Sequence, residues 1–264
     1  MNGPEMLEIR CSRAWPPLTE QSLGDWVLRW AGGFTGRANS VLAVGDAGRP
    51  VREALDAVCD FAHDRGIPPM AQVVRDSPNE HAIAAGGWVE AKGHRRGHEV
   101  VVLTAPLTPE RHFHVKVAPP GGHFHVKVPD EPTPGWWELT LGPGEDSPAA
   151  RRVLTGGKVG YGVATLDGVT AGVVRGALVD GWLHVGRLEV APAFRRRGLA
   201  SALMGALGAW GVEHGAGHAV LQVAEGNEGA LALYSGLGYA PHHRYRYWVP
   251  APGSRIEGEE DPTS

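Results

Sequence analysis

The residues with the clearest capacity for chemistry form a short loop, RRRGLA, at positions 195–200. The segment before it, LHVGRLEV (183–190), is rich in apolar residues and predicts a strand buried on both faces, which Pro192 ends. From Leu199 onward apolar residues recur at helical spacing, which predicts a helix. The loop therefore stands at a junction between a strand and the first turn of a helix.

Such a junction is a natural anion site. The first amides of a helix lack partners within the helix, and the helix dipole places partial positive charge there. Gly198 lets the backbone approach a ligand closely, and the arginines add charge-assisted hydrogen bonds to phosphate oxygens. We therefore expect a phosphate-bearing ligand at this loop.

This half of the chain resembles the GNAT family, the general amine N-acetyltransferases. The loop fits the family's pyrophosphate motif R/Q-x-x-G-x-G/A, with Ala200 in the last small position, and an LxV-x-P pattern precedes it. The run Asn227-x-x-Ala230-x-x-Leu233-Tyr234-x-x-x-Gly238-Tyr239 is similar to the second signature, N-x-x-A-x-x-L-Y-x-x-x-G-F/Y. The resemblance covers residues 130–249, whereas residues 1–105 share only the order of elements.

The resemblance implies an α/β fold with a mixed sheet. It implies two GNAT-like acyl-CoA N-acyltransferase folds in tandem, each with a central twisted sheet flanked by helices. The implied activity is transfer of an acetyl group from acetyl-CoA to a primary amine, by direct attack in a ternary complex and without a metal ion. The acceptor is either a small molecule or an exposed protein amine.

The resemblance also implies cofactor contacts. Main-chain groups at the end of the strand would hold the pantetheine arm like an added strand, and backbone amides of the loop would cradle the pyrophosphate. Asn227 would contact the cofactor from the start of its helix, cap that helix, or do both. The implied cofactor-binding residues are Leu188, Glu189, Val190, Arg195, Arg196, Arg197, Gly198, Leu199, Ala200, Ser201, Asn227, Ala230 and Tyr234.

Tyr234 is implied to be the catalytic acid that protonates the departing thiolate. Phenols have a pKa near ~10 and thiols one near ~8.5, so this proton transfer is energetically feasible. The alternative is a packing role, because Tyr234 shares helical spacing with Ala230, Leu233 and Leu237.

The general base is the less defined partner. An alkylamine, with a pKa of ~10.4, must lose a proton before it can attack a thioester. Several relatives carry a glutamate six residues before the position of Val190, where this chain has His184. His184 is therefore the candidate base, directly or through water, and a structural role is the alternative. Glu189 is a further candidate, but strand alternation is expected to point it away from His184.

Some protein N-terminal acetyltransferases use a glutamate base five residues before the motif asparagine. This chain has Gln222 there, which cannot act as a base and counts against that subgroup.

Near the acceptor entrance we expect Trp136, Trp137 and the run from His242 to Tyr247. The alternating Tyr and Arg residues of that run form either a packed edge strand, the default interpretation, or an aromatic and cationic wall.

The two halves of the chain resemble each other, which indicates a tandem duplication. Residues 61–103 are similar to residues 210–249, and the matches are Gln72 with Gln222, Asn79-Glu80 with Asn227-Glu228, and Gly87-Trp88 with Gly238-Tyr239. In the first half the strand 39–46 runs through AGRP directly into a helix, without the arginine loop. The first half is therefore interpreted as a degenerate copy, so that acetyl-CoA binds once per chain.

The expected organisation follows from this duplication. Residues 1–108 form the degenerate GNAT-like domain, 109–130 a linker hairpin, 131–250 the catalytic domain and 251–264 a disordered tail. HFHVKV occurs twice in the linker, so that His112, His114, His123 and His125 look like a metal cluster. A duplicated hairpin without further ligands is the preferred interpretation.

Composition excludes several other classes. The formal net charge of −4 gives no reason to expect nucleic acid or an anionic membrane as partner. No apolar run reaches ~18 residues and no signal-peptide pattern opens the chain, so we expect a cytoplasmic protein. The sequence contains neither a GxxxxGK[ST] run nor a GxGxxG run after a strand, so no such motif indicates nucleotide binding. The alternative function is a non-catalytic acyl-CoA sensor.

Overall fold

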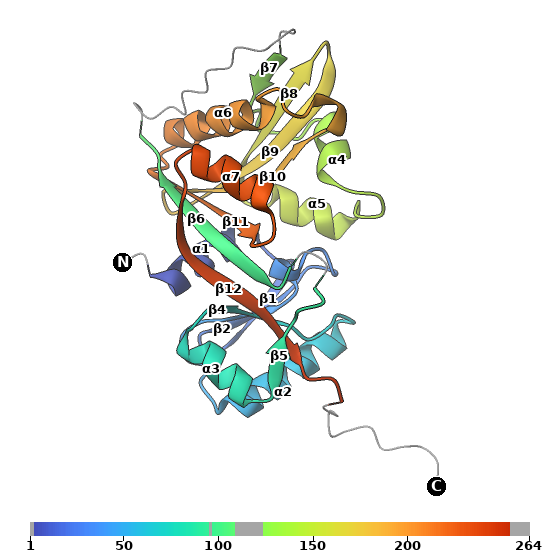
Figure 1. Cartoon of the computed structure of the whole chain (residues 1–264). Coiled ribbons are helices and arrows are strands. Elements are labelled where there is room, and N and C mark those ends of the chain that lie inside the picture. The colour runs from blue at the N-terminus through green and yellow to red at the C-terminus, as the bar shows by residue number, and fades with distance from the viewer. Residues whose placement is uncertain (1–2, 95–96, 109–123, 254–264) are drawn as a thin grey trace. The chain divides into compact units, whose positions relative to one another are not determined.

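The computed structural model describes residues 3–94, 97–108 and 124–253 (Figure 1). The chain divides into a larger unit, Met1–Pro16 with Val100–His243, and a smaller unit, Pro17–Glu99 with Arg244–Ser264. Both units are therefore built from discontinuous segments. The expected limits 1–108 and 131–250 describe stretches of sequence rather than these compact units, and they stay a prediction.

The larger unit contains a mixed sheet in the order β6-β11-β10-β9-β8-β7, in which only β10 and β11 are paired in parallel among the described pairings. Its elements are α1 (Pro4–Ala14), β6 (Glu99–Pro106), β7 (Phe124–Lys127), α4 (Pro134–Thr140), α5 (Pro148–Thr155), β8 (Lys158–Leu166), β9 (Val169–Val179), β10 (Trp182–Val190), η2 (Pro192–Phe194), α6 (Leu199–Glu213), β11 (His218–Ala224), α7 (Glu228–Gly236) and the start of β12 (Ala240–Pro250).

Helices cover both faces of this sheet. Helices α6 and α7 lie against this sheet (Figure 1), and their apolar residues share one buried cluster with residues of β6, β9, β10 and β11. On the opposite face, the fully buried Arg175 of β9 donates hydrogen bonds to the carbonyls of Leu154 in α5 and Ala14 in α1, at 2.8 and 3.0 Å. A buried guanidinium with several carbonyl acceptors ties both helices to the sheet.

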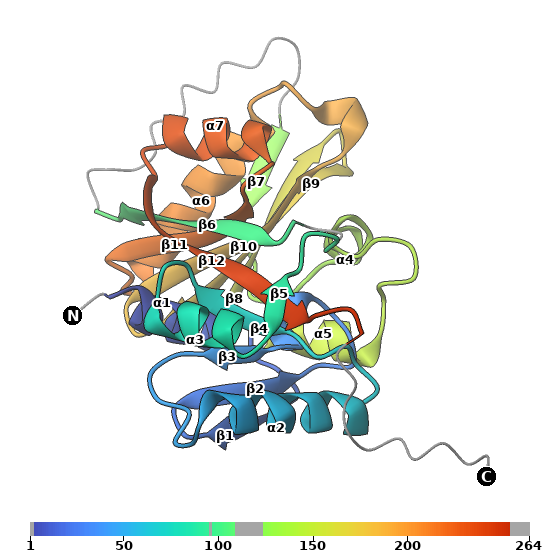
Figure 2. The same cartoon turned by 60° about the horizontal axis from the view of Figure 1, so that its bottom comes forward.

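The smaller unit has the sheet order β1-β2-β3-β4-β12, with β5 paired to β12. Its helices α2 and α3 are shown in Figure 2, and α2 buries its apolar face against the strands. The remaining elements are β1 (Thr19–Leu23), β2 (Trp26–Trp30), η1 (Gly36–Ala38), β3 (Val41–Ala43), α2 (Val51–Asp64), β4 (Ala71–Val74), α3 (Pro78–Ala85) and β5 (Trp88–Glu90).

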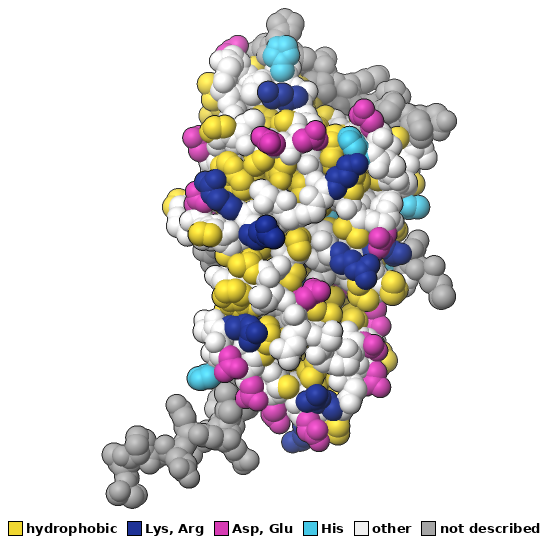
Figure 3. Space-filling view, turned by 180° about the vertical axis from the view of Figure 1, so that it is seen from behind, with side chains coloured by type: hydrophobic (Ala, Val, Ile, Leu, Met, Phe, Trp, Pro, Cys, Tyr) yellow, Lys and Arg dark blue, Asp and Glu magenta, His cyan; other side chains and the backbone are white. Residues whose placement is uncertain are grey.

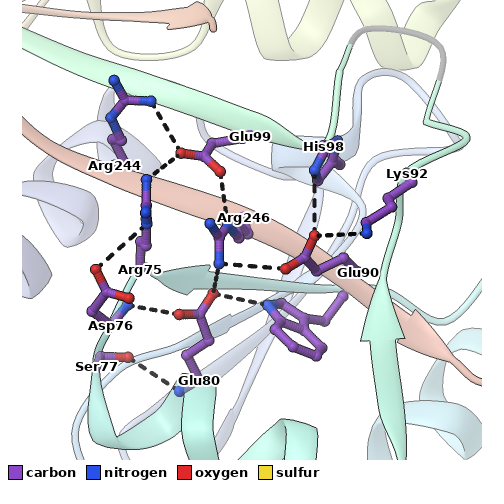
Figure 4. A network of polar contacts seen from close by, with 11 residues as sticks. Arg75, Asp76, Ser77, Glu80, Glu90, Lys92, His98, Glu99, Arg244 and Arg246 are labelled. Atoms are coloured by element: carbon purple, nitrogen blue, oxygen red, sulfur yellow. Dashed lines mark hydrogen bonds and ion pairs between the residues drawn. The ribbon is translucent and has the colours of Figure 1, made fainter.

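An ion-pair network joins β12 to the rest of the smaller unit (Figure 4). The Arg246 guanidinium lies 2.8 Å from Glu99, 3.4 Å from Glu90 and 3.5 Å from Glu80. Burial by itself would raise the pKa of Glu99, but hydrogen bonds from Arg246 and Arg244 and their charges hold this pKa below its ordinary value. The Glu99 charge therefore stabilises the smaller unit above the ordinary carboxyl pKa.

The predicted duplication is visible in matching helix starts. Ser77 and Asn227 are the N-caps of α3 and α7, and each side chain accepts a hydrogen bond from an amide in the first turn. Each stands five positions after a strand glutamine, Gln72 or Gln222. The counterpart of Asn227 is therefore Ser77 and not Asn79, because capping geometry fixes the position and residue identity does not.

Other expectations meet the structure only partly. His112, His114 and His123 lie outside the described residues, as does the tail beyond residue 253. Among the described residues no group of His, Cys, Asp and Glu could hold a metal ion. No helix in the described part of the chain is long and apolar enough to cross a membrane. On the face shown in Figure 3, side chains of both charges are interspersed with apolar ones.

Candidate functional site

Strand β10 separates from β11 halfway along its length. Its ladder with β11 ends at Val185↔Leu221, whereas its ladder with β9 continues to Val190↔Gly172. Residues of β10 are buried up to Val185 and at least partly exposed beyond it. The expectation of burial on both faces is therefore confirmed only for the first half of the strand, and the second half has one edge without a β11 partner.

A β-bulge redirects the exposed half of β10. The register with β9 shifts just before Glu189, and Arg187 takes a left-handed φ of 53°. An extra residue reverses the alternation of side chains between the two faces of a strand. His184 is opposite Ala177 and Glu189 is opposite Val173, so both lie on one face. The expectation that Glu189 points away from His184 is wrong, because it assumed an unbroken strand.

The predicted loop follows directly and is exposed. Arg195 donates a hydrogen bond from Nε to the Val190 carbonyl at 3.1 Å, which ties the loop to the end of β10. Arg196 has a φ of 63°, and Gly198, with a φ of 78°, is the N-cap of α6. The side chains of Arg195, Arg196 and Arg197 are exposed. A cationic loop thus surrounds the predicted helix start.

The start of α6 is open to an anion. Gly198 has no side chain to cap the helix, in contrast to Asn227 on α7. The helix amides therefore lack the side-chain acceptor that such a position usually provides. A Cβ atom added to Gly198 would meet no atom of the described residues within 4 Å, so these residues leave the space open. These features fit a pyrophosphate group.

Tyr234 lies on α7 within the apolar cluster of the larger unit. Its side chain is 9% exposed, and its ring centroid is 5.9 Å from that of Tyr239. Burial, and next the charge of Glu189, raise the pKa of Tyr234 to about 12. The phenol therefore keeps its proton at neutral pH and is available as a hydrogen-bond donor or acid. Its packing role and its acid role are compatible.

His184 is sealed inside the larger unit. The residue is 1% exposed, and its ring centroid is 6.3 Å from that of Trp15, which follows α1 and is 2% exposed. A base at this position cannot touch an acceptor amine without an intermediate group. The assignment of His184 as base stays a prediction that requires such an intermediate.

A second polar cluster, which the sequence does not predict, lies beside the gap between β10 and β11. The carboxylate of Glu8 on α1 accepts hydrogen bonds from Gln222 Nε2, at 3.2 and 3.1 Å, and lies 3.0 Å from His243 Nε2. His243 Nδ1 in turn lies 2.8 Å from His242 Nδ1. The only signal was Gln222 itself, which stands where some protein N-terminal acetyltransferases have a glutamate. Nothing in the local sequence connects Glu8 to a strand more than 200 positions away.

The aromatic residues expected near the acceptor are packed. Trp136 is fully buried and donates from Nε1 to the Val174 carbonyl at 3.2 Å. Tyr245 and Tyr247 are 1% and 4% exposed. The default interpretation of a packed strand is therefore correct for these tyrosines, and they form no aromatic wall. A cavity of about 540 Å³ lies in the smaller unit beside Gly36, and none of the predicted site residues lines it.

The chain is similar to known acetyltransferases over most of its length. A protein-family model described as "Probable histone acetyltransferase Rv0428c C-terminal" matches residues 5–248. "Uncharacterized N-acetyltransferase YobR" of Bacillus subtilis (strain 168) is 25% identical over 93% of this chain and 99% of its own length. "Acetyl transferase GW6a" of Oryza sativa subsp. japonica is 43% identical over 58 residues, which are 22% of this chain and 14% of that protein.

Solved structures share the fold. A "GCN5-related N-acetyltransferase from Kribbella flavida" has a TM-score of 0.68 at 16% identity, over 97% of this chain and 98% of the other. A "Tandem GNAT protein from the clavulanic acid biosynthesis pathway" has a TM-score of 0.62 at 16% identity, over 94% and 89% of the two chains. The second likeness agrees with the expected pair of related folds.

Proposed function

The chain belongs to the Rv0428c C-terminal acetyltransferase family and is a GNAT-type acetyltransferase, and from this premise we propose that it transfers an acetyl group from acetyl-CoA to a primary amine. The open start of α6 beside the unpaired edge of β10 is the observation that supports this proposal best. In this arrangement one acetyl-CoA binds per chain, in the larger unit.

Different segments of the larger unit bind different parts of acetyl-CoA. Backbone amides from Arg196 to Ser201 hold the pyrophosphate, and Arg195, Arg196 and Arg197 supply the positive charge. Main-chain groups of Leu188, Glu189 and Val190 face the gap left by β11 and hold the pantetheine arm. Asn227 caps α7 through its Oδ1 atom, which accepts from the Ala230 amide at 3.1 Å, and its Nδ2 group is a potential donor to the cofactor.

The reaction itself needs two proton transfers. The amine nitrogen attacks the thioester carbonyl carbon, an N–C bond forms, the C–S bond breaks, and a thiolate leaves. Tyr234 donates a hydrogen bond or its proton to that thiolate. The burial that raises the pKa of Tyr234 to about 12 also raises the pKa of a thiol placed beside it, so donor and acceptor stay matched. The amine proton leaves through a base.

A panel assay tests the proposal. The whole chain is incubated with acetyl-CoA and, separately, a polyamine, an amino acid, an aminoglycoside and a lysine peptide. Free thiol and acetylated amine are both measured. We expect thiol release that depends on the amine, with one acetylated product per thiol. Tight binding of acetyl-CoA, measured by calorimetry, without thiol release for any amine would instead establish a sensor.

A further inference from the structure

Helix α1 places the carboxylate of Glu8 against the side-chain amide of Gln222 on β11. The side chain of Glu8 is 0% exposed and is held by Gln222 and His243 through the contacts of 3.0–3.2 Å described above. Burying a carboxylate is costly unless donors surround it. Apolar residues could join α1 to β11 without the desolvation free energy of a buried carboxylate. The presence of Glu8 at this contact therefore calls for a functional explanation.

The hydrogen positions in this cluster follow from elementary rules. An ionised carboxylate only accepts, so His243 Nε2 carries a hydrogen, and the Nδ1 atom of a neutral His243 holds a lone pair. His243 Nδ1 lies 2.8 Å from His242 Nδ1, and two lone pairs repel at that distance. With His243 neutral, His242 carries its hydrogen on Nδ1, and the basic nitrogen of a neutral His242 is then Nε2.

Exposure rises in order along the cluster. The Glu8 side chain is 0% exposed, that of His243 is 6% exposed, and His242 is exposed. A proton that arrives from outside at His242 therefore has a continuous path to a buried negative charge. The same order of groups, an outer base held in one tautomer by a buried carboxylate, is the arrangement that orients histidine bases in enzymes.

The cluster also stands where the donor is proposed to react. Gln222 is the first residue of β11 after its last pair with β10, Val185↔Leu221. The parallel register places Gln222 on the same face of the sheet as His184, because His184 is opposite Val220. Glu8 thus supplies a carboxylate beside the gap between these strands, next to Gln222, which stands where some protein N-terminal acetyltransferases have a glutamate base.

We propose that His242, His243 and Glu8 form a proton relay that deprotonates the acceptor amine; this inference rests on the proposed function. The amine proton moves to His242 Nε2, and the hydrogen on His242 Nδ1 moves to His243 Nδ1. The resulting His243 imidazolium is stabilised by the Glu8 carboxylate. His242 is the residue that touches the acceptor, whereas His243 and Glu8 are positioning residues. After acetyl transfer the proton returns to solvent through His242.

The relay is tested by the pH dependence of kcat in His242→Ala, His243→Ala and Glu8→Gln. With an alkylamine acceptor we expect kcat to fall about 100-fold at pH 7, the usual contribution of a general base. The loss should shrink towards pH ~10.4, where the amine sheds its own proton. The KM for acetyl-CoA should not change. Arg13→Gln is the matched control, because Arg13 lies on the same helix with a 63% exposed side chain paired to Asp180.

A second readout does not depend on activity. Two-bond ¹H–¹⁵N spectra of the whole chain at neutral pH should show His243 protonated at Nε2 and His242 at Nδ1. The opposite pattern would overturn the relay. In Glu8→Gln, the preference of His243 for the Nε2 hydrogen should weaken, because an amide oxygen is a poorer acceptor than a carboxylate.

The outcomes separate the relay from the proposed function. Full kcat in His242→Ala at pH 7, with normal acetylation by the wild type, overturns the relay and leaves the function standing. An equal loss at pH 7 and pH 10 indicates a purely structural role and also overturns it. If Glu8→Gln does not fold, His242→Ala decides, because His242 is exposed. A wild type that acetylates no amine refutes the function, and the relay with it.

Discussion

The two units contain a similar strand-to-helix junction that differs in charge, because three arginines precede α6 whereas Asp46 and Arg49 precede α2. In the larger unit, β10 leads through Arg195, Arg196 and Arg197 to an uncapped helix start at Gly198. In the smaller unit, β3 leads to α2 through a segment in which Asp25 accepts from the Asp46 amide, at 2.9 Å, and Asp46 accepts from the Gly48 amide, at 2.8 Å. Carboxylates thus hold two amides of the loop before α2, whereas the first turn of α2 after Pro50 has no side-chain cap, as in α6. The difference supports a single cofactor site per chain.

The helices that follow the next strands differ as well. Tyr234 is seven positions after the N-cap of α7, and the same position after the N-cap of α3 is Ala84. The matching glutamines also face different charges, since Gln72 accepts from buried Arg29 at 2.8 Å whereas Gln222 donates to Glu8. Among the described residues, the smaller unit has neither a glycine-bearing arginine loop before α2 nor a tyrosine at the position that matches Tyr234.

The largest effect is expected from a substitution that places a carboxylate at the start of α6 in the larger unit. Gly198→Asp should weaken acetyl-CoA binding at least ~100-fold, because a negative side chain enters the space for the pyrophosphate. Gly215→Asp is the control, since Gly215 also has a positive φ, of 90°, and open space around it. Calorimetry measures both affinities. An unchanged affinity in Gly198→Asp would remove the loop from the site.

The phenol is tested by Tyr234→Phe, which leaves the larger unit without the hydroxyl, as Ala84 leaves the smaller one. We expect kcat to fall about 30-fold while acetyl-CoA affinity changes little, because the hydroxyl acts on the departing thiolate. Tyr239→Phe, a neighbouring buried tyrosine, should keep kcat within about twofold. Full turnover in Tyr234→Phe would leave this tyrosine with its packing role alone.

A smaller effect is expected for single arginines. Arg196→Ala should weaken acetyl-CoA binding about fivefold and reduce its dependence on salt, because one exposed charge is removed from the loop. Arg49→Ala removes the arginine at the corresponding junction of the smaller unit and should change neither. Titrations at low and high salt measure both variants. Equal effects of the two substitutions would contradict a single site.

The smallest effect concerns stability in alkali. The pKa of Tyr234 is about 12 in the folded chain, and a phenol in an unfolded chain has a pKa of ~10. The stabilisation of the folded chain is fully present below pH ~10 and is lost as the pH rises through the folded pKa. The free energy of unfolding should be about 1 kcal/mol lower at pH 11 for this reason. Thermal unfolding at pH 8 and pH 11 measures the loss. The loss should shrink in Tyr234→Phe, and an undiminished loss there would place its origin elsewhere.

Local patterns predicted the elements around the site well. Pro192, the spacing from Leu199 and the signature from Asn227 predicted the end of β10, the start of α6 and the start of α7, all of which are confirmed. These features depend on a few neighbouring residues. The bulge at Arg187 was not predictable, because a left-handed φ at a non-glycine residue leaves no mark in the sequence. The contact of Glu8 with β11 depends on packing between distant segments.

The strand β12 has a consequence for how the protein is made. Residues of β12 pair with β4 through Tyr245↔Val74 and with β5 through Val249↔Val89, all within the smaller unit. Ribosomes deliver the chain from its N-terminus, so residues 17–99 emerge long before the strand that completes their sheet. The smaller unit, whose other strands all emerge before residue 100, is therefore completed late, and until β12 emerges its β4 edge needs protection from other chains.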